Sequence, residues 1–306
     1  MAMTGVLRPG FAQLRVLDMD AALRHYVDYI GLSLVSREAD GRVYLKAWDE
    51  FDRHSVVLRE SDHAGIDVMA FKVDSDASLS DFARRSEAFG LAVDHVGEGE
   101  QPGLGRRVGV TIPSGHRIEL YADIAAAETA PGTHNPYLWH EAPHGMGAIR
   151  MDHGLLYGPN IEQVLAYFTE VLDFRLTEKV DLPDGLLGIW MSCSNKAHDI
   201  AFVKHPDPGK LHHLAFFLED WNAVGHAADL MIRHDVAIDI GPTRHGITRG
   251  QTIYFFDPSG NRNEVFAGGY QFYPDQPVRT WDHTEIGRGI FYYERVLNDR
   301  FLSVVT

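Results

Sequence analysis

Hydrophobic and polar residues follow the same succession of patterns in two halves of the chain. Each half opens on a short run of alternating apolar and polar residues, at 11–16 and 150–156, which is typical of a strand. Apolar residues three and four positions apart then extend over 21–30 and 161–172, which indicates an amphipathic helix. The sequence therefore predicts a strand followed by a helix at the start of each half.

The patterns after these helices also occur in pairs. Asp-Gly turn signals at 40–41 and 184–185 lie 144 residues apart, and each separates two predicted strands. A further strand in each half precedes a second helix, predicted over 77–89 and 221–234, and two last strands complete the half. Each half is therefore predicted as two βαβββ units, so the expected fold is α+β with four such units.

A repeated decapeptide supports duplication of one module. PSGHRIELYA at 113–122 recurs as PSGNRNEVFA at 258–267, and six of the ten positions are identical. Residues 124–145 contain several prolines and glycines without helical or strand periodicity, as expected for a connector. Since 306 residues suit two domains of about 150 each, we expect domains at 1–145 and 146–306.

The region after Tyr270 has no counterpart in the first half. Its pattern predicts a helix over 284–301, capped by Thr284 and packed across the second domain. The expected buried face of this helical tail contains Phe291, Tyr292, Leu297 and Phe301.

Composition narrows the classes of partner. The chain has 28 basic against 43 acidic residues and a formal charge of -15, which argues against a nucleic acid or an anionic membrane as partner. A single cysteine, Cys193, excludes an intrachain disulfide framework and a site of several thiolates, and it favours a cytoplasmic location. The sequence has no run of about 20 apolar residues, as a membrane span would require.

The two halves differ in residues that can bind a metal. Alignment of the repeat gives three pairs: Gln13 with His153, Val68 with His213, and Glu119 with Glu264. Two imidazoles and a carboxylate on three strands suit non-haem Fe(II) or manganese, with positions left open for a substrate and O2. The second half alone has this set. In the alternative interpretation, the two histidines are separate core or surface residues and Glu264 pairs with Arg262.

A second histidine beside His213 leaves the choice of ligand open. Strand alternation permits only one of His212 and His213 to face inward. The apolar residues Leu214, Phe216 and Leu218 place His212 in their own register, so the pattern does not select His213. The repeat alignment does not decide between them either.

A motif at the predicted glutamate ligand is similar to a known enzyme signature. Thr243-Arg-His245 is followed, after seven residues, by Ile253-Tyr254-Phe-Phe-Asp257-Pro258-Ser-Gly260-Asn-Arg-Asn-Glu264. This motif resembles the signature of type I extradiol ring-cleavage dioxygenases, which include the catechol 2,3-dioxygenases. The resemblance extends over nearly the whole chain, through 8–10, 14–19, 42–48, 196–199 and 238–246.

This resemblance implies a fold, a cofactor and a reaction. The fold would be the paired βαβββ arrangement of the vicinal oxygen chelate superfamily, with Fe(II) in the C-terminal module and a homotetrameric assembly. Within the histidine pair the second member would ligate, which is His213 here. The reaction would insert both atoms of O2 into a catechol ring beside the diol, giving a 2-hydroxymuconic semialdehyde, in the degradation of aromatic compounds.

The resemblance also implies roles for three further residues. His198 would lie beside O2 and move a proton, while His245 and Tyr254 would donate hydrogen bonds to the substrate oxygens. Without the resemblance, these residues are interpreted as two loop histidines and one core aromatic. The candidates for the apolar wall of the pocket are Trp190, Met191, Ile290 and Phe301.

Other functions in the same superfamily are weighed against this one. They are a manganese-dependent extradiol dioxygenase of another catecholic substrate, a non-redox metal isomerase of the glyoxalase type, and a ligand-binding protein. The latter two usually build one site from two modules or chains, whereas the predicted ligands here lie in one module. The sequence does not indicate which substituted catechol is preferred.

Overall fold

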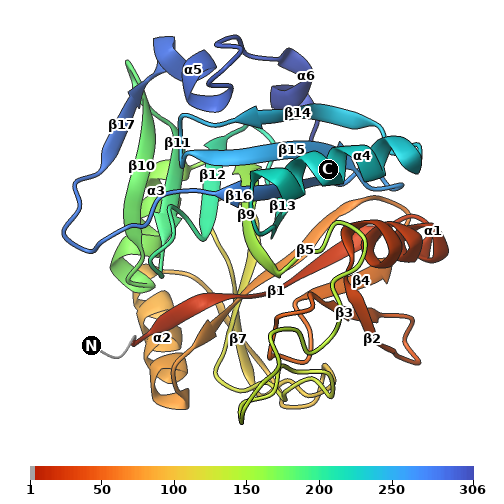
Figure 1. Cartoon of the computed structure of the whole chain (residues 1–306). Coiled ribbons are helices and arrows are strands. Elements are labelled where there is room, and N and C mark those ends of the chain that lie inside the picture. Colours follow the sequence, from red (N-terminus) through yellow and green to blue (C-terminus); the bar gives the residue numbers. More distant parts are fainter. Residues whose placement is uncertain (1–3) are drawn as a thin grey trace.

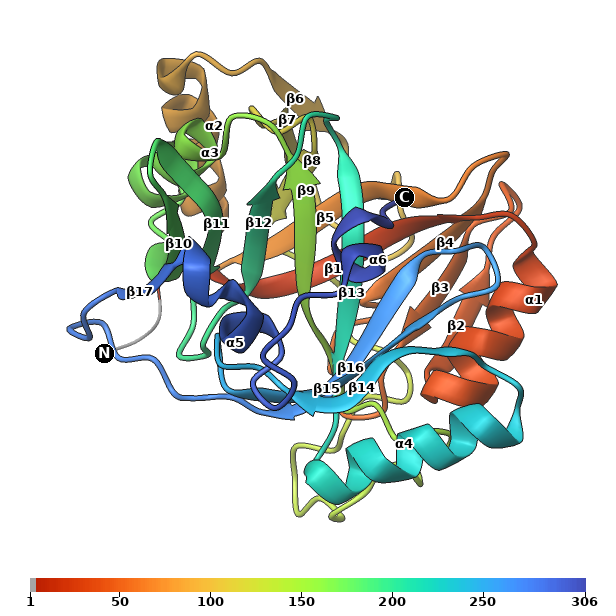
Figure 2. The ribbon, with the colours of Figure 1, turned by 90° about the horizontal axis from the view of Figure 1, so that it is seen from above.

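The computed structural model describes residues 4–306 as two twisted sheets (Figures 1 and 2). The first sheet has eight strands in the order β2-β3-β4-β1-β5-β8-β7-β6. Its strands are β1 (Val6–Val16), β2 (Ser33–Arg37), β3 (Val43–Lys46), β4 (Val56–Glu60), β5 (Gly65–Val73), β6 (Val93–Val96), β7 (Arg107–Thr111) and β8 (Arg117–Tyr121).

The second sheet has nine strands in the order β14-β15-β16-β13-β9-β12-β11-β10-β17. Its strands are β9 (Arg150–Gly158), β10 (Arg175–Leu182), β11 (Gly185–Ser192), β12 (Ile200–Lys204), β13 (Lys210–Phe217), β14 (Ile238–Arg244), β15 (Gly250–Phe256), β16 (Arg262–Gly268) and β17 (Arg279–Asp282).

The four predicted helices are present, and they complete four βαβββ units in the predicted order. Two of them begin as α-helix and continue as π-helix: α1 (Met19–Leu23) with η1 (Arg24–Ile30), and α3 (Ile161–Ala166) with η2 (Tyr167–Val171). The other two are α2 (Asp76–Phe89) and α4 (Trp221–Arg233). Asp220 caps α4 by accepting a hydrogen bond from the backbone of Ala223, and Gly90 ends α2 in a left-handed conformation.

Both faces of each sheet contain buried residues. One face of each sheet contributes to a single large core that joins the two modules, in which Tyr26 Oη donates to Asp257 across the interface over 3.0 Å. A smaller cluster lies on the opposite face, around Phe11 in the first sheet and Leu155 in the second. Because the large core is continuous, the division at residue 145 stays a prediction.

The Pro-Ser-Gly corner of each module contacts the end of the first strand of the other module. Both corners use a glycine with a positive φ, 85° at Gly115 and 93° at Gly260, which a side chain would strain. In the second corner, Ser259 Oγ accepts a hydrogen bond from the backbone N–H of Leu17 over 2.8 Å. The first corner lies against the end of β9, where a Cβ on Gly158 would come within 2.6 Å of the Ser114 carbonyl oxygen. The repeated decapeptide therefore forms reciprocal contacts between the modules.

The predicted helix over 284–301 is wrong. The tail instead forms a 3-10 turn η3 (His283–Glu285) and two short helices, α5 (Ile286–Ile290) and α6 (Asp299–Ser303). Gly287 and Gly289 weaken the helix, and the chain leaves it so that the Tyr292 N–H can donate to the Arg244 carbonyl over 2.7 Å. Asp282, and not Thr284, caps the first turn.

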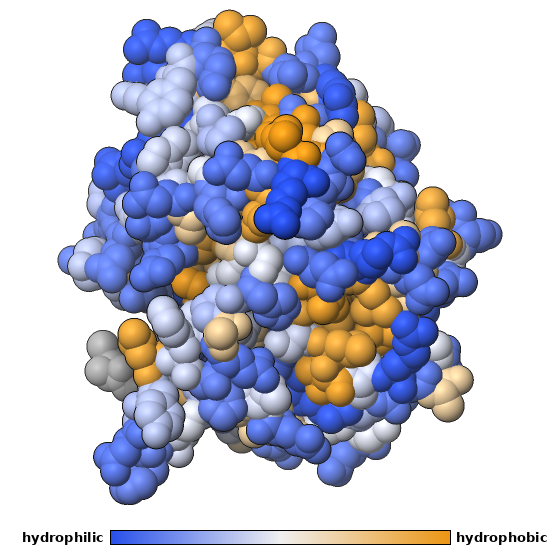
Figure 3. Space-filling view, turned by 45° about the vertical axis from the view of Figure 1, so that its right-hand side comes forward, coloured by the Kyte–Doolittle hydropathy of each residue, from blue (hydrophilic) through white to orange (hydrophobic). Residues whose placement is uncertain are grey.

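The tail nevertheless packs across the second sheet, as predicted (Figures 1 and 2). Phe291 and Phe301 are buried in it, but Leu297 is half-buried and Tyr292 is exposed. None of the helices over residues 4–306 has the length and apolar character needed to cross a membrane. The face shown in Figure 3 is mostly hydrophilic, with several apolar patches.

Candidate metal centre

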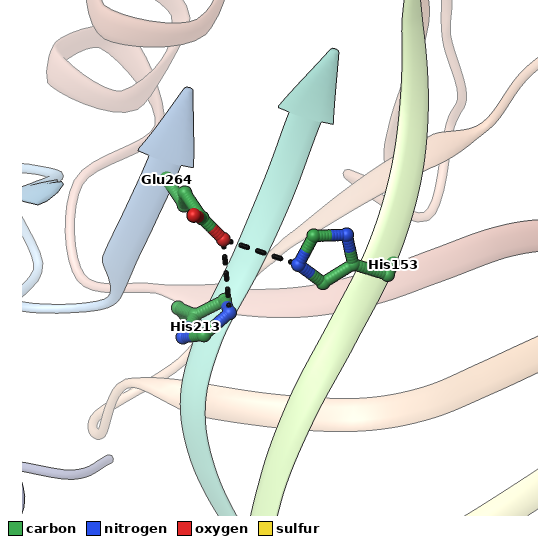
Figure 4. Close-up of side chains that lie close together, drawn as sticks. All are labelled: His153, His213 and Glu264. Atoms are coloured by element: carbon green, nitrogen blue, oxygen red, sulfur yellow. Dashed lines mark hydrogen bonds and ion pairs between the residues drawn. The ribbon is translucent and has the colours of Figure 1, made fainter. Parts of the chain in front are cut away.

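Three side chains from neighbouring strands converge on one point (Figure 4). His153 lies on β9, His213 on β13 and Glu264 on β16, and these strands are adjacent in the second sheet. The Nε2 atoms of the two histidines lie 3.1 Å and 3.2 Å from the same carboxylate oxygen, Oε2 of Glu264. All three residues are buried, and their potential ligand atoms lie within 4.8 Å of one another. The residues predicted from the sequence are thus brought together in a geometry that could hold a metal ion.

Among residues 4–306, no arginine pairs with the carboxylate of Glu264. Arg262 donates to Asp239 over 3.0 Å, so the alternative pairing of Arg262 with Glu264 is wrong. Burial alone would raise the pKa of Glu264, but the hydrogen bond with His153 opposes burial, and this pKa lies well below its usual range. An ionised carboxylate between two imidazoles is a suitable ligand set for a divalent metal.

His153 is oriented by a carboxylate behind it. Its Nδ1 lies 3.0 Å from Asp152 Oδ2, which leaves Nε2 directed at Glu264. Asp152 is in turn held by Lys196 at 3.2 Å and by Arg150 at 2.9 Å. Metal-binding histidines commonly donate their second ring nitrogen to such a partner.

The residue patterns along the chain did not indicate Asp152, Lys196 or Thr252 as parts of this site. Thr252 Oγ1 donates to Oε1 of Glu264, the oxygen that does not contact His153 or His213. Only the position of Asp152, directly before a predicted ligand, could have drawn attention to it, because the contacts of Lys196 and Thr252 depend on strand pairing.

The Nε2 atom of His213 is a buried nitrogen that lacks a hydrogen-bond partner among residues 4–306. It lies 3.2 Å from Glu264 Oε2 without the alignment of a hydrogen bond. Burial lowers the pKa of His213 to about 4, so the imidazole is neutral near pH 7. A neutral imidazole with a free lone pair is the form that binds a metal, and this atom therefore fits the proposed ion.

The expectation that only one of His212 and His213 faces inward is wrong. The pairing of β13 with β9 shifts register between Leu211 and His213, and such a bulge places an extra residue in the strand. His212 stacks on Tyr157 with ring centroids 4.7 Å apart, on the same side of the sheet as His213. The bulge is what the alternation pattern could not reveal.

His198, His245 and Tyr254 line one cavity with the three candidate ligands. The rings of His198 and His153 have centroids 4.0 Å apart, and Tyr254 Oη lies 2.7 Å from His245 Nε2. Burial, together with the nearby His153, holds the pKa of His198 well below its usual range. The cavity thus presents two imidazoles and one phenol beside the convergent ligands.

The rest of the cavity wall is mainly apolar. Its apolar side chains are Leu155, Trp190, Ile247, Phe266, Ile290 and Phe301. Three of the four predicted wall residues are therefore present. Met191 is the exception, because its side chain alternates with that of Trp190 along β11 and packs in the large core.

Comparisons with known proteins agree with this geometry. Residues 66–125 match the catechol 2,3-dioxygenase-like N-terminal domain, and residues 150–265 match the glyoxalase/bleomycin resistance protein/dioxygenase superfamily. The chain is 50% identical to a metapyrocatechase from Pseudomonas sp. (strain CF600), over 99% of each chain. The chain belongs to the extradiol ring-cleavage dioxygenases.

Two further relatives of this dioxygenase bear on its fold and metal. A solved structure of the 2,3-dioxygenase LapB from Pseudomonas sp. KL28 is 49% identical, with a TM-score of 0.90 over 92% of this chain and 99% of that one. A manganese-dependent 2,3-dihydroxybiphenyl 1,2-dioxygenase from Geobacillus genomosp. 3 is 29% identical over 93% of this chain and 92% of its own. The vicinal oxygen chelate fold predicted from the resemblance is confirmed, and the enzyme class is metal-dependent.

Strand pairing corrects one alignment between the modules of this dioxygenase. Two equivalent sets of paired residues occur: Glu119, Ala70 and Phe11 in the first module, and Glu264, Ala215 and His153 in the second. Phe11, and not Gln13, therefore occupies the place of His153. Register shifts on both sides of Phe11 move β1 relative to β5, which a comparison of sequences alone does not detect.

The surroundings of Phe11 support this equivalence. The matching ring contacts, by centroid distance, are Phe11 with His54 at 5.5 Å and Tyr121 at 5.8 Å, and His153 with His198 at 4.0 Å and Phe266 at 5.0 Å. His54 is thus the counterpart of His198 in the first module.

Proposed function

We propose that this dioxygenase cleaves catechol, or a substituted catechol, with O2 beside the diol and gives a 2-hydroxymuconic semialdehyde. The observation that carries the proposal is the convergence of two imidazole nitrogens and one carboxylate oxygen at the edge of a mainly apolar cavity. A flat ring with two adjacent oxygens suits such a cavity, since the ring contacts the apolar wall and the oxygens reach the ligands. The identity with a metapyrocatechase supports the same substrate class.

His153, His213 and Glu264 are the proposed ligands of Fe(II). When bound, the metal supplies open positions for the two catechol oxygens and O2 and a path for electrons between them. Two histidines and one carboxylate are the ligand set typical of non-haem Fe(II) oxygenases. The manganese-dependent relative favours Mn(II) as the second candidate, because both ions accept these ligands.

Tyr254 and His245 are proposed to bind the substrate oxygens. Burial raises the pKa of Tyr254 well above its usual value, so its hydroxyl stays protonated and can donate. His245 Nδ1 contacts the Ile290 carbonyl oxygen, which can only accept, so Nδ1 carries the proton. In a neutral ring Nε2 then faces the cavity as an acceptor, and not as the donor that the family resemblance implies. A donor and an acceptor placed together can take a proton from one catechol oxygen and hold the other.

His198 is proposed to move a proton at the side of the cavity beside His153. Its imidazole is neutral because of burial, so it can accept a proton from the substrate side and return it later. The wall of the cavity is otherwise mainly apolar, so the side chains placed to exchange protons with the substrate are His198, His245 and Tyr254.

A homotetramer in the cytoplasm completes the proposal, as the family resemblance and the single cysteine suggest. Membership of the extradiol family argues against the glyoxalase-type and ligand-binding alternatives.

The test is anaerobic reconstitution of metal-depleted protein with Fe(II) or Mn(II), followed by addition of catechol and O2. We expect the yellow ring-fission product with Fe(II). Absence of colour with both metals, in folded protein shown to contain the metal, would contradict the proposed reaction.

A further inference from the structure

His212 lies between a proposed metal ligand and the C-terminal tail. It is buried, with its Nδ1 2.8 Å from Nδ1 of His213 and its Nε2 2.8 Å from the carbonyl oxygen of Phe301. Its ring also stacks on Tyr157, at an interplanar angle of 22°. Each nitrogen of this imidazole therefore has one polar neighbour.

The carbonyl of Phe301 determines which nitrogen of His212 carries the proton. A carbonyl oxygen accepts hydrogen bonds and cannot donate, so a contact of 2.8 Å requires a proton on Nε2 of His212. In a neutral imidazole the other nitrogen then bears the lone pair. His212 is buried, and its polar neighbours are a carbonyl oxygen, another imidazole and the Arg262 guanidinium, which donates to the His212 backbone carbonyl. A buried imidazolium with these neighbours would lack an anionic partner, so the imidazole is neutral.

The protonation of His212 in turn determines which nitrogen of His213 carries a proton. Because Nδ1 of His212 can only accept, Nδ1 of His213 must donate across the 2.8 Å contact. Neutral His213 then has its lone pair on Nε2, the buried nitrogen that has no hydrogen-bond partner in the described part of the chain. That lone pair is directed at the point shared with Glu264.

We propose that His212, fixed by the Phe301 carbonyl, is a positioning residue that locks His213 in the tautomer able to bind the metal. The inference rests on the proposed function, in which His213 is a ligand. It gives His213 a hydrogen-bond partner behind the ring, as Asp152 is behind His153.

The tail is anchored on both sides of this contact. Leu211 and Thr306 exchange two backbone hydrogen bonds, of 2.8 Å and 3.1 Å, and Arg262 donates to the Val304 carbonyl over 2.8 Å. The Phe301 ring packs against Tyr254 with centroids 4.9 Å apart. Residues 301–306 therefore hold the carbonyl in place and couple the tail to the metal affinity.

The tautomers can be read directly in the full-length, metal-free protein. With 15N-labelled histidine, ring-nitrogen NMR shifts should show His213 protonated on Nδ1 and His212 protonated on Nε2. The signals are assigned from their loss in His212→Gln and His213→Ala. A proton on Nε2 of His213 would overturn the inference, even if His213 still proves to be a ligand.

Metal affinity supplies a second test, with Mn(II) as the probe in competition with a chelator. His212→Phe keeps a stacking ring but removes the acceptor, and we expect affinity to fall about 10- to 100-fold, as for other groups behind metal ligands. His212→Gln retains an acceptor and a donor and should restore affinity to within about threefold. The matched control is His116→Phe, since His116 is also buried and contacts a backbone carbonyl, of Lys210, at 3.0 Å, but lies outside the site.

The outcomes separate the inference from the proposed function. If His212→Phe binds Mn(II) like the wild type while His213→Ala does not, the positioning role is wrong and the ligand assignment stands. If His213→Ala also binds like the wild type, the proposed metal site itself is wrong. Equal losses in His212→Phe and His212→Gln would overturn the inference, because Gln keeps the hydrogen bonds. Should His212→Phe fail to fold, the wild-type NMR measurement still decides.

Discussion

Each module has one buried glutamate at the equivalent position of its sheet, but the side chains that contact this glutamate differ between the modules. In the first module, Glu119 accepts hydrogen bonds from Arg107 and Arg117, both over 2.8 Å. In the second, the carboxylate of Glu264 lies beside the imidazoles of His153 and His213, and no guanidinium within residues 4–306 contacts it. A buried carboxylate needs a compensating positive charge. The first module supplies this charge from its own side chains, whereas the second leaves it to the proposed metal.

The surrounding frame is retained in both modules. An arginine two residues before the glutamate pairs with an aspartate in each: Arg117 with Asp94 at 2.6 Å, and Arg262 with Asp239 at 3.0 Å. Three positions around the glutamate carry different residues in the two modules. The first module has Phe11, Val68 and Arg107 where the second has His153, His213 and Thr252. A few substitutions on a fixed frame therefore separate an ion-paired scaffold from a candidate metal centre.

The largest expected effect comes from replacing His153 in the second module by phenylalanine, the residue at the equivalent position of the first module. His153→Phe removes one ligand, and we expect metal affinity and turnover to fall by at least about 1000-fold, since a bound metal contributes several kcal/mol. Metal titration and formation of the yellow product measure both quantities. The reverse change, Phe11→His, should not create a site, because Val68 offers no ligand and Glu119 is already paired. Metal binding that survives in His153→Phe would contradict the comparison.

The ion pair of the first module should matter for stability and not for the metal. Arg107→Met leaves Glu119 with one guanidinium, and we expect the free energy of unfolding to fall by about 3 kcal/mol. Denaturant unfolding measures this change, and metal affinity should stay at the wild-type value. The control is Arg106→Met, whose exposed pair with Asp76 should contribute less than about 1 kcal/mol. Similar losses in both variants would argue against the buried pair as the stabilising element.

The two equivalent histidines should differ in turnover. His198→Phe removes the proposed proton carrier, so we expect kcat to fall about 100-fold with metal affinity nearly unchanged. His54→Phe, at the matching position of the first module, should leave kcat unaltered. Steady-state rates with catechol and a metal titration distinguish the two variants. Equal rates would mean that His198 has no role in proton transfer.

The smallest effect, taken per pH unit, concerns the first module alone. Burial lowers the pKa of His54 to about 3, and both of its ring nitrogens lack partners within residues 4–306. The unfolded chain therefore binds a proton at this residue near pH 6.5, whereas the folded chain does so only near pH 3. Between pH 6 and 4 this difference should lower stability by about 1.4 kcal/mol per pH unit. His54→Phe should reduce the slope by that amount in unfolding experiments across this range. An unchanged slope would show that another group determines it.

Local patterns predicted the order of elements because turns, caps and amphipathic helices are specified by near neighbours. Asp-Gly at 40–41 and the cap at Asp220 are examples that need no tertiary information. The single helix predicted for the tail is wrong because the course of the chain depends on contacts with β14, where the Arg244 backbone carbonyl accepts a hydrogen bond from the Tyr292 N–H. Apolar spacing alone could not reveal that hydrogen bond.

The candidate site was predictable in its residues but not in its register. Aligning the repeat identified Glu264 and two histidines, yet it matched His153 to Gln13 and could not choose between His212 and His213. Both failures come from β-bulges, since one extra residue changes which side chains face the cavity. The groups behind the ligands, such as Asp152, also depend on how strands pair.

The reciprocal contacts at the Pro-Ser-Gly corners affect the order in which the two modules can assemble during synthesis. The backbone N–H of Leu17, at the end of β1, donates to Ser259, which is synthesised 242 residues later. At about 5–20 residues per second, a ribosome needs roughly 10–50 s to make that distance. During this interval the end of β1 lacks its contact with the second module, so this contact forms only after Ser259 has been synthesised.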